Sequence, residues 1–385
     1  MRLGDIIEIK HGYAFSGDHI IEEDNNVVLV TPGNFRIGGG FQEKKCKFFN
    51  GDLPSDYILN EGDFIVTMTD LSKTIDTLGY SAIVPKSKNR IYLHNQRIGL
   101  VHFKNDICDR GYIYWLMRTR DYQRTIANTS TGSTVHHTSP SKIYDYEFET
   151  PDKAAQYRVA SILFHYDSLI ENYQKQIKLL EESAQHLYKE WFVDLRFPGH
   201  ENTKIVDGVP EGWEKKKVGN LISKVLRTKQ VSANNYLYSG RFPVIDQSRN
   251  YIAGYTNDIE SLVEVTIPYI VFGDHTRVLK YVPFSFAKGA DGTQLIMSND
   301  LERMPQSLFY NSLIEIDLSN YSYARHFKYL KEESILVPSK DIAQRYDKVV
   351  SQHCQSIQKS RDQIRHLTEA RDRLLPKLMS GKIEV

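Results

Sequence analysis

The sequence is poor in the features that mark secreted, membrane-bound or metal-stabilised proteins. Its three cysteines are odd in number and too far apart for a disulfide framework or a zinc site. No apolar run approaches the roughly 18 residues that a membrane span needs, and the first residues, MRLGDIIEIKHG, lack the apolar core of a signal peptide. We therefore expect a cytoplasmic protein in which Cys46, Cys108 and Cys354 are small buried side chains.

Motifs for catalysis are missing as well. The sequence has no Asn-Pro-Pro-Tyr or Asp-Pro-Pro-Tyr of an amino-methyltransferase, no glycine-rich cofactor loop and no Walker phosphate loop. The adjacent His136 and His137 have no third metal ligand nearby. Asp274 and His275 have no neighbouring nucleophile, and a turn in which Asp274 caps backbone N–H groups is the simpler interpretation. We predict that the chain is not an enzyme and binds neither metal nor cofactor itself.

The chain also lacks the positive charge of a protein that binds nucleic acid without sequence preference. Its 49 Lys and Arg residues oppose 48 Asp and Glu residues, a net charge of +1. Residues 1–150 are slightly acidic, with 17 Lys/Arg against 19 Asp/Glu. Because non-specific DNA affinity comes from summed phosphate neutralisation, a DNA-binding role would need local basic spots or charge from a partner.

One design does occur twice in the sequence. A globular segment rich in aromatic and β-branched residues is followed each time by a proline and a long helical pattern. The helices are predicted over residues 151–192 and from residue 338 to the C-terminus. Gln156 and Gln344 occupy matching positions, where we expect polar residues of the first turn and nothing more.

Apolar residues recur along both helices at steps of three and four, which is typical of a coiled coil. The first has one extra step of four between Leu169 and Ile177, and the second is interrupted by His353, Ser360 and Arg371, so it is a poor homodimer zipper. Since the chain order is domain, helix, domain, helix, the second helix can run back along the first only antiparallel. In the predicted pairing, Leu169, Tyr173 and Ile177 face Ile357, Ile364 and Leu367.

The globular segments predict short strands between turn-forming residues. The first adds a helix over residues 111–127 and a polar loop over 128–139. The second starts at Trp213, and its Val218–Ile222 resembles Leu3–Ile7 near the N-terminus. The predicted strands are Val27–Val30, Phe64–Met68, Ser81–Val84, Ile98–Phe103, Thr266–Phe272 and Val278–Val282.

These patterns predict an α+β fold of two strand-rich domains separated by two long helices in an antiparallel, pseudo-two-fold coiled coil. A helix of about 38 residues is about 57 Å long, a length in range for two DNA-reading domains spaced by one or more turns of the duplex. The predicted divisions are 1–150 (first domain), 151–197 (helix), 198–212 (linker), 213–336 (second domain) and 337–385 (helix and tail).

Four stretches together resemble the specificity subunits of Type I restriction–modification systems. Lys189–Gly199 (KEWFVDLRFPG) and Pro210–Trp213 (PEGW) are similar to the central conserved region of that family. Leu374–Ile383 (LLPKLMSGKI) is similar to its C-terminal end, and Phe272–Thr276 (FGDHT) to a loop of one class of its target-recognition domains. The resemblance covers the whole length of the chain.

The resemblance implies a non-catalytic, sequence-specific DNA-binding subunit. Each domain would read one half of a split double-stranded DNA target, and the helices would set the gap and dock two methyltransferase subunits, through which restriction and translocase subunits bind. S-adenosylmethionine, ATP and Mg²⁺ would bind those partners. Trp191 and Phe192, at the end of the first helix, pack against the neighbouring domain or the other helix, or form a methyltransferase contact.

Base readout needs Arg, Lys, Asn, Gln and similar donors presented from loops or helix ends. Taken alone, each candidate is more often a solvated surface residue than a base contact. The predicted DNA contacts of the first domain are Arg36, Lys44, Lys45, Lys73, Asn95, Gln96, Arg97, Ser133, Thr134, His136 and His137. Those of the second domain are Gln247, Ser248, Arg249, His275, Thr276, Arg277 and Lys288.

Two alternatives stay open from the sequence. The chain could be a coiled-coil scaffold whose end domains bind proteins, in which case no DNA footprint would form even with partners present. It could also serve a Type IIG or Type IIB-like methyltransferase–nuclease.

Overall fold

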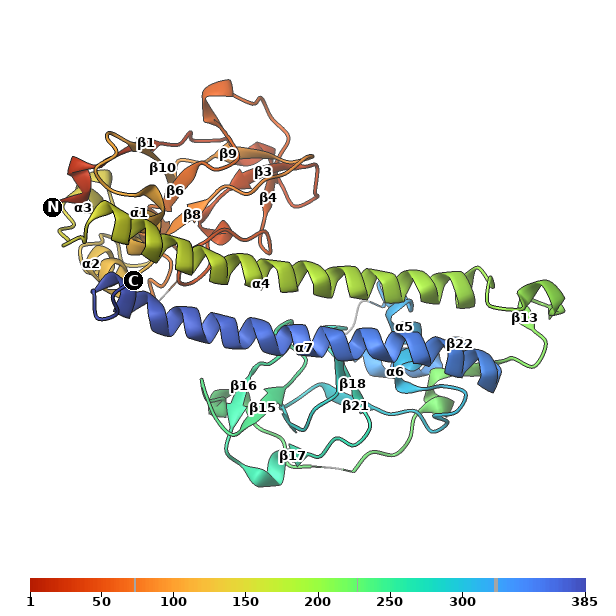
Figure 1. Cartoon of the computed structure of the whole chain (residues 1–385). Helices are drawn as coiled ribbons and strands as arrows, with labels where there is room; N and C mark the ends of the chain where they lie inside the picture. The colour runs from red at the N-terminus through yellow and green to blue at the C-terminus, as the bar shows by residue number, and fades with distance from the viewer. Residues whose placement is uncertain (73, 227, 322–324) are drawn as a thin grey trace. The chain divides into compact units, whose positions relative to one another are not determined.

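The computed structural model shows an α+β fold, as predicted. Two compact units are present: Met1–Ile170 together with His366–Val385, and Glu171–Arg365. Helices α4 (Lys153–Tyr188) and α7 (Lys340–Met379) contribute residues to both units (Figure 1). The structure describes residues 1–72, 74–226, 228–321 and 325–385.

The first unit is built on two sheets. One has four strands in the order β1-β10-β6-β8, and the other has five in the order β2-β4-β3-β9-β5. Within them the pairing is antiparallel, except that β3 and β9 run parallel. The strands are β1 (Ile7–His11), β2 (Ile20–Ile21), β3 (Val27–Val30), β4 (Lys47–Phe49), β5 (Ile58–Leu59), β6 (Phe64–Thr67), β8 (Ser81–Ile83), β9 (Ile91–His94) and β10 (Ile98–Phe103).

Strand β6 shows how this unit is layered. Every residue of β6 is buried, so the strand has no solvent-facing side. Phe64 and Val66 belong to the cluster shared with the helices, whereas Ile65 between them belongs to the cluster shared with the other sheet. Because side chains alternate across a strand, the β6 sheet lies between a layer of helices and the five-stranded sheet. A short, continuously apolar run is the pattern expected of such a strand.

The helix predicted over residues 111–127 is wrong as a single element. The structure has α1 (Arg110–Leu116) and α2 (Arg120–Asn128) instead. The break arises because the Thr119 hydroxyl accepts the Tyr122 N–H at 3.3 Å and caps a new helix.

The polar loop predicted over residues 128–139 is confirmed except at one point. His136 and His137 form the short strand β11, which pairs with β7 (Thr69–Asp70). The next element is the short helix α3 (Pro140–Tyr144). Pairing with β7 therefore fixes the position of a segment that the sequence shows only as polar.

The second unit repeats the two-sheet plan with different strand orders. One sheet has the order β16-β15-β20-β17 and another the order β19-β18-β21, with the pairs β14-β22 and β12-β13 beside them. Its strands and shorter helices are β12 (Ile205–Val206), β13 (Val209–Pro210), β14 (Glu214–Lys217), β15 (Phe242–Ile245), β16 (Gly254–Thr256), β17 (Leu262–Val263), β18 (Tyr269–Gly273), β19 (Leu279–Val282), β20 (Phe286–Lys288), β21 (Thr293–Ile296), β22 (Ser334–Val337), α5 (Gln306–Ile314) and α6 (His326–Glu332).

Strand β18 occupies the place in this unit that β6 occupies in the first. Ile270 and Phe272 pack into the cluster shared with α5, α4 and α7, and Val271 between them packs into the cluster of the other sheet. The resemblance between the two domain starts also has a structural counterpart. Leu3 and Val218 each begin a short 3₁₀ turn with a fully buried side chain.

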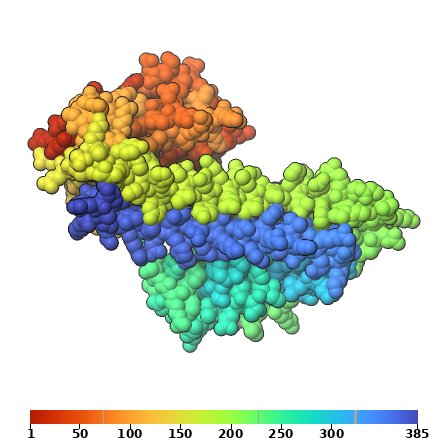
Figure 2. Space-filling view, in the orientation of Figure 1, coloured from red at the N-terminus to blue at the C-terminus, as the bar shows by residue number. Residues whose placement is uncertain are grey.

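Helices α4 and α7 pack against each other antiparallel, as predicted. In the first unit, Asp167 of α4 forms an ion pair with Arg371 of α7. In the second, the Tyr346 hydroxyl donates to the carbonyl of Ala184 at 3.3 Å, and Arg361 pairs with Glu181 at 3.0 Å. In the space-filling view the side chains of the two helices meet along a common seam (Figure 2).

The predicted facing residues need one correction. Leu169 is 46% exposed, whereas its neighbour Ile170 is 4% exposed. The extra step of four in the apolar stripe falls here, so the buried face of α4 shifts by one residue. Two of the polar interruptions of α7 have polar partners on α4: Ser360 reaches Gln176 at 3.4 Å, and Arg371 pairs with Asp167. Nδ1 of the third, His353, is buried without a hydrogen-bond partner among the described residues.

The expectation for Gln156 is also wrong, because its side chain is buried and bonded at both ends. Its Oε1 accepts the N–H of Asp109 at 2.8 Å, and its Nε2 donates to the carbonyl of Pro151 at 2.9 Å. Gln344, in the matching position of α7, donates to the carbonyl of Glu302 at 2.9 Å. Each glutamine therefore ties a helix start to its own domain.

Candidate nucleic-acid interface

Several predicted contacts of the first unit come together beyond the end of β6. The backbone N–H of Met68 donates to the carbonyl of Arg97 at 2.9 Å, and the N–H of Thr138 donates to the carbonyl of Met68 at 3.0 Å. Segments 95–97 and 131–138 are thus both tied to one residue. Of the predicted contacts there, Gln96, Arg97, Ser133, Thr134 and His137 are exposed.

Not every residue of this cluster is free to read a base. Asn95 is buried, and its Oδ1 accepts the N–H of Arg97 at 3.0 Å, so it shapes the turn. His136 is half-buried, and Nδ1 of His137 lies 3.2 Å from the Thr69 hydroxyl. Arg97 remains the extended donor that the cluster presents. Lys73 lies outside the described residues.

A buried aspartate that the sequence analysis did not single out organises the loop after β7. The Asp70 carboxylate accepts N–H bonds from Ser72, Thr77 and Leu78 at 2.6, 2.7 and 3.1 Å. Burial alone would raise the pKa of Asp70, but the hydrogen bonds from Thr77 and Ser72 outweigh it and lower the pKa. The same loop holds Ile75 at φ +51°, a rare conformation for a β-branched residue. An aspartate three positions after the apolar strand β6 was the available sequence signal.

A second group of predicted contacts in the first unit lies on the excursion between β3 and β4. Arg36, Lys44 and Lys45 are exposed there. The Arg36 turn is closed by backbone bonds from Arg36 N–H to the Gly40 carbonyl at 3.0 Å and from Gly39 N–H to the Arg36 carbonyl at 2.9 Å. Ile37 beside Arg36 is 72% exposed. The turn therefore presents one basic and one apolar side chain to solvent.

In the second unit, the residues of the Gly-Asp-His-Thr loop gather around Gln247. Its Oε1 accepts the N–H of His275 at 3.1 Å, its Nε2 donates to the carbonyl of Asp291 at 2.9 Å, and the Thr276 hydroxyl donates to the Gln247 carbonyl at 2.5 Å. The amide of Gln247 is thus used inside the protein. Its role is to hold three loops together, while His275 and Thr276 stay exposed.

Asp274 accepts a backbone N–H, as the simpler interpretation predicted, but this N–H belongs to helix α6 and not to a turn around Asp274. Asp274 is 7% exposed, and its Oδ1 accepts the N–H of Phe327 in the first turn of α6 at 2.8 Å. Arg277 stands in the left-handed region at φ +61°, with Nε 3.2 Å from Nε2 of His326. The exposed Arg277 is therefore held in a defined orientation.

The remaining predicted contacts of the second unit are less uniform. Lys280, which was not among the predicted contacts, is 4% exposed. It donates to the carbonyls of Asp246 and Asn250 at 2.7 and 2.5 Å. These two bonds fix the segment that carries Ser248 and Arg249. Burial, only partly offset by Asp246, lowers the pKa of Lys280 to about 8. Arg249 is exposed and Ser248 is half-buried. The backbone N–H of Ser248 donates to the Asp246 carboxylate.

Lys288, the last predicted contact, is half-buried near the end of β20. Its carbonyl accepts the N–H of Val231 at 3.0 Å. Together with Leu226, Thr228 and Gln230 it borders a cavity of 470 Å³.

Trp191 and Phe192 lie on a π-helical turn, Lys189–Val193, that ends α4. Phe192 is buried, with ring centroids 5.1 Å from Tyr346 and 5.6 Å from Trp213. Trp191 is half-buried, 6.0 Å from Tyr346. Phe192 is therefore a core residue, whereas part of the Trp191 side chain remains exposed and could contact a partner.

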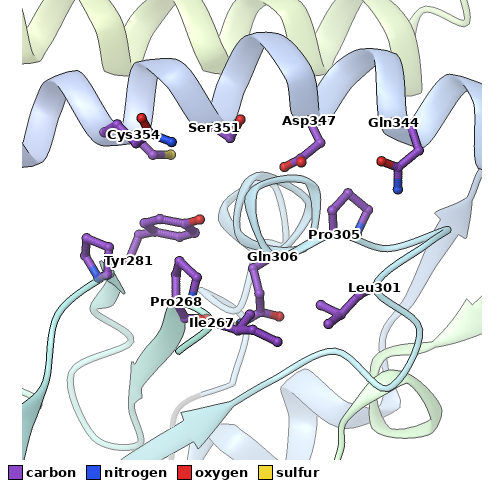
Figure 3. Close-up of a pocket in the computed structure, with 12 residues that line it drawn as sticks. Ile267, Pro268, Tyr281, Leu301, Pro305, Gln306, Gln344, Asp347, Ser351 and Cys354 are labelled. Atoms are coloured by element: carbon purple, nitrogen blue, oxygen red, sulfur yellow. Dashed lines mark hydrogen bonds between the residues drawn. The ribbon is translucent and has the colours of Figure 1, made fainter. Parts of the chain in front are cut away.

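A cavity of 310 Å³ lies between α7 and the loops of the second domain (Figure 3). Gln344, Asp347 and Cys354 project into it from α7, opposite Pro268 and Pro305. Burial raises the pKa of the Cys354 thiol to about 12, so it is protonated at neutral pH. The Ser307 hydroxyl donates to Asp347 at 2.6 Å, and no histidine lines the cavity. These groups do not make an activated nucleophile.

Comparison with known proteins agrees with the architecture. The family model "Type I restriction modification DNA specificity domain" matches residues 1–182. The specificity subunit of the Type I restriction enzyme MjaIX of Methanocaldococcus jannaschii is 25% identical over 315 residues, 74% of this chain and 72% of the relative. The chain is thus similar to the specificity subunits of Type I restriction–modification systems over most of its length.

Two further relatives extend the comparison. The EcoR124I/EcoR124II specificity subunit of Escherichia coli is 29% identical over 99 residues, 25% of this chain and 24% of the relative. The crystal structure of the S subunit of a Type I system from M. genitalium has a TM-score of 0.60 at 16% identity, over 98% of this chain and 95% of that chain, and shows the shared fold.

The role that these matches indicate is that of a DNA specificity subunit, which is not a catalytic subunit. Within the described ranges, no group of three or more His, Cys, Asp or Glu side chains could hold a metal ion. None of the helices described here is both long and apolar enough to cross a membrane.

Proposed function

We propose that this specificity subunit reads a bipartite double-stranded DNA sequence with two target-recognition domains, residues 1–150 and 213–336. The observation that carries the proposal is the repeated construction of the two units. In each, a central strand buried on both faces, β6 or β18, leads into a buried aspartate, Asp70 or Asp274. The Asp70 carboxylate accepts three backbone N–H bonds in the loop after β7, and the Asp274 carboxylate accepts the N–H of Phe327 at the start of α6, so each aspartate fixes the chain beside predicted DNA contacts. Two separately ordered polar loops suit a target in two halves.

The exposed polar clusters near these two aspartates offer different side chains, so we infer that they read different half-sequences. The first cluster presents Arg97 and the hydroxyls of Ser133 and Thr134, and the second presents His275 and Arg277. Arginine can bind guanine through two hydrogen bonds, which is the commonest specific contact in the major groove. Different donors in a different order then select different bases.

The near-neutral charge of the chain indicates what its partners would have to supply. With 49 basic and 48 acidic residues, this subunit has little net charge for phosphate neutralisation. We infer that two methyltransferase subunits supply much of the phosphate contact and bind along α4 and α7, with Trp191 in the contact. Restriction subunits would join through them. S-adenosylmethionine, ATP and Mg²⁺ would bind the partners, and the complex would act in the cytoplasm.

Mapping methylated adenines across the genome, in cells with and without the gene, tests this function. We expect methylation at one split motif to disappear with the gene and to return with a plasmid copy. Unchanged methylation would contradict the proposal. If no footprint forms on DNA even with all partners present, the result would instead favour the protein-binding scaffold. Methylation and cleavage by a single partner polypeptide would favour a Type IIG or Type IIB-like system.

A further inference from the structure

Arg118 is a buried arginine that joins three parts of the first unit. It follows α1, and its side chain is 4% exposed. The guanidinium carbon lies 4.1 Å from the ring centroid of Trp115 and 5.1 Å from that of Tyr114. Planar guanidinium groups stack on aromatic faces in a way that lysine cannot match. The site is therefore shaped for arginine and not for positive charge alone.

Arg118 donates directly to α4 and is linked through Asp167 to α7. Nη1 donates to Oδ2 of Asp167 on α4 at 2.9 Å and to the hydroxyl of Tyr114 at 3.0 Å. The other oxygen of Asp167 pairs with Arg371 of α7. Burial alone would raise the pKa of Asp167, but the two guanidinium groups outweigh it and lower the pKa, so the carboxylate stays ionised. Arg118 is thus anchored to the helix pair by a buried charge network.

The third part is the turn that carries Arg36. Nε of Arg118 donates to the carbonyl of Gly38 at 2.9 Å. Gly38, Gly39 and Gly40 all have φ between +83° and +88°, and a Cβ at Gly39 would lie 2.6 Å from Cγ of Arg118. The turn therefore rests directly on the Arg118 side chain. Three successive glycines have many alternative conformations, so an ordered turn depends on such ties.

We propose that Arg118 is a positioning residue for DNA readout: it fixes the Arg36–Gly40 turn to the paired helices so that Arg36 and Ile37 meet one half-site in a defined orientation. This rests on the proposed function of the chain. Among the described hydrogen bonds of residues 36–40, two join the turn to the rest of the domain: one from Gly40 N–H to the Ser81 carbonyl and one from Arg118 to the Gly38 carbonyl. Without Arg118 the turn keeps its donors but loses their orientation.

The test uses the full chain reconstituted with its methyltransferase subunits. Duplexes carry the motif mapped for the wild-type protein, with single-base changes in the first or the second half. For Arg118→Met, which keeps the volume and removes the donors, we expect discrimination at one or more first-half bases to fall by roughly ten-fold. Discrimination in the second half should be unchanged. Arg118→Lys should not restore it, because lysine lacks the planar fork.

Two further variants separate positioning from stability. Gly39→Ala pushes the turn off Arg118 while Arg118 keeps Asp167, so it should relax the same first-half bases even if Arg118→Met does not fold. The control is Arg303→Met in the second unit, an arginine that likewise binds backbone carbonyls, those of Pro338 and Val337, and pairs with Glu214. It should lower stability without altering first-half preference.

The outcomes decide between the explanations. Equal relaxation of both halves by Arg118→Met and Gly39→Ala, or full discrimination retained by Gly39→Ala, would overturn the positioning role. In either case the wild-type complex still methylates its motif. If the wild-type complex shows no base preference at all, the proposed function itself fails, and this result differs from both of the others.

Discussion

Replacement of Tyr346 tests the packing of the two long helices most sharply. Tyr346 on α7 is fully buried, with ring centroids 5.1 Å from Phe192, 6.0 Å from Trp191 and 6.4 Å from Tyr188. Removing a large buried aromatic side chain costs about 3–5 kcal/mol. Tyr346→Phe loses only the 3.3 Å hydrogen bond to the Ala184 carbonyl, which costs about 1 kcal/mol. We therefore expect Tyr346→Ala to be several times as destabilising as Tyr346→Phe.

Native-state hydrogen exchange measured by mass spectrometry is the suitable assay, because it reports stability segment by segment in a chain with two units. Peptides from residues 171–188 and 340–365 should lose protection by roughly 10²–10⁴-fold in Tyr346→Ala and by less than about ten-fold in Tyr346→Phe. The matched control is Val349→Ala, since Val349 is on the same helix but 41% exposed and should change little. A loss in Tyr346→Ala no larger than in Val349→Ala would refute the packing argument.

Three other outcomes follow from single residues. Burial, only partly offset by the bond to the Ile98 carbonyl, lowers the pKa of His94, so the unfolded chain binds a proton at this histidine more tightly than the folded chain does. The first unit should therefore lose stability as the pH falls below about 6.5 towards the folded-state pKa. In hydrogen-exchange measurements, His94→Gln should remove this pH dependence of stability. Arg277→Ala should weaken methylation of the second half-site by about 1–3 kcal/mol, and Arg277→Lys should lose base preference more than affinity in the same competition assay. Cys354, with a thiol pKa raised to about 12, should react with iodoacetamide at about pH 8 far more slowly than an unfolded control, as followed by mass spectrometry; rapid labelling of the folded chain would contradict its burial.

The sequence predicted the elements whose signal is local and repeated. The long apolar stripes predicted α4 and α7, and chain order alone predicted that they pair antiparallel. The short runs Val27–Val30 and Ile98–Phe103 occur as strands with those limits. The similarity of the two domain starts, at Leu3 and Val218, also has its counterpart in matching 3₁₀ turns.

What the sequence did not reveal depends on contacts between distant residues. No residue near Arg118 in the sequence predicts its contacts with Asp167 and Gly38, which lie 49 and 80 positions away. The buried Lys280 reads as an ordinary strand lysine until the carbonyls of Asp246 and Asn250 are placed around it. The break between α1 and α2 was missed because a single threonine, Thr119, can cap a new helix inside an unbroken apolar pattern. The predicted domain limits and DNA contacts stay predictions.

Exchange of one domain tests the central claim most directly. Residues 1–150 would be replaced by the first domain of another family member, and methylated adenines would be mapped across the genome. The account predicts that one half of the split motif changes while the other half and the gap between them persist. A shift of both halves together, or an unchanged motif, would contradict the assignment of one half-site to each domain.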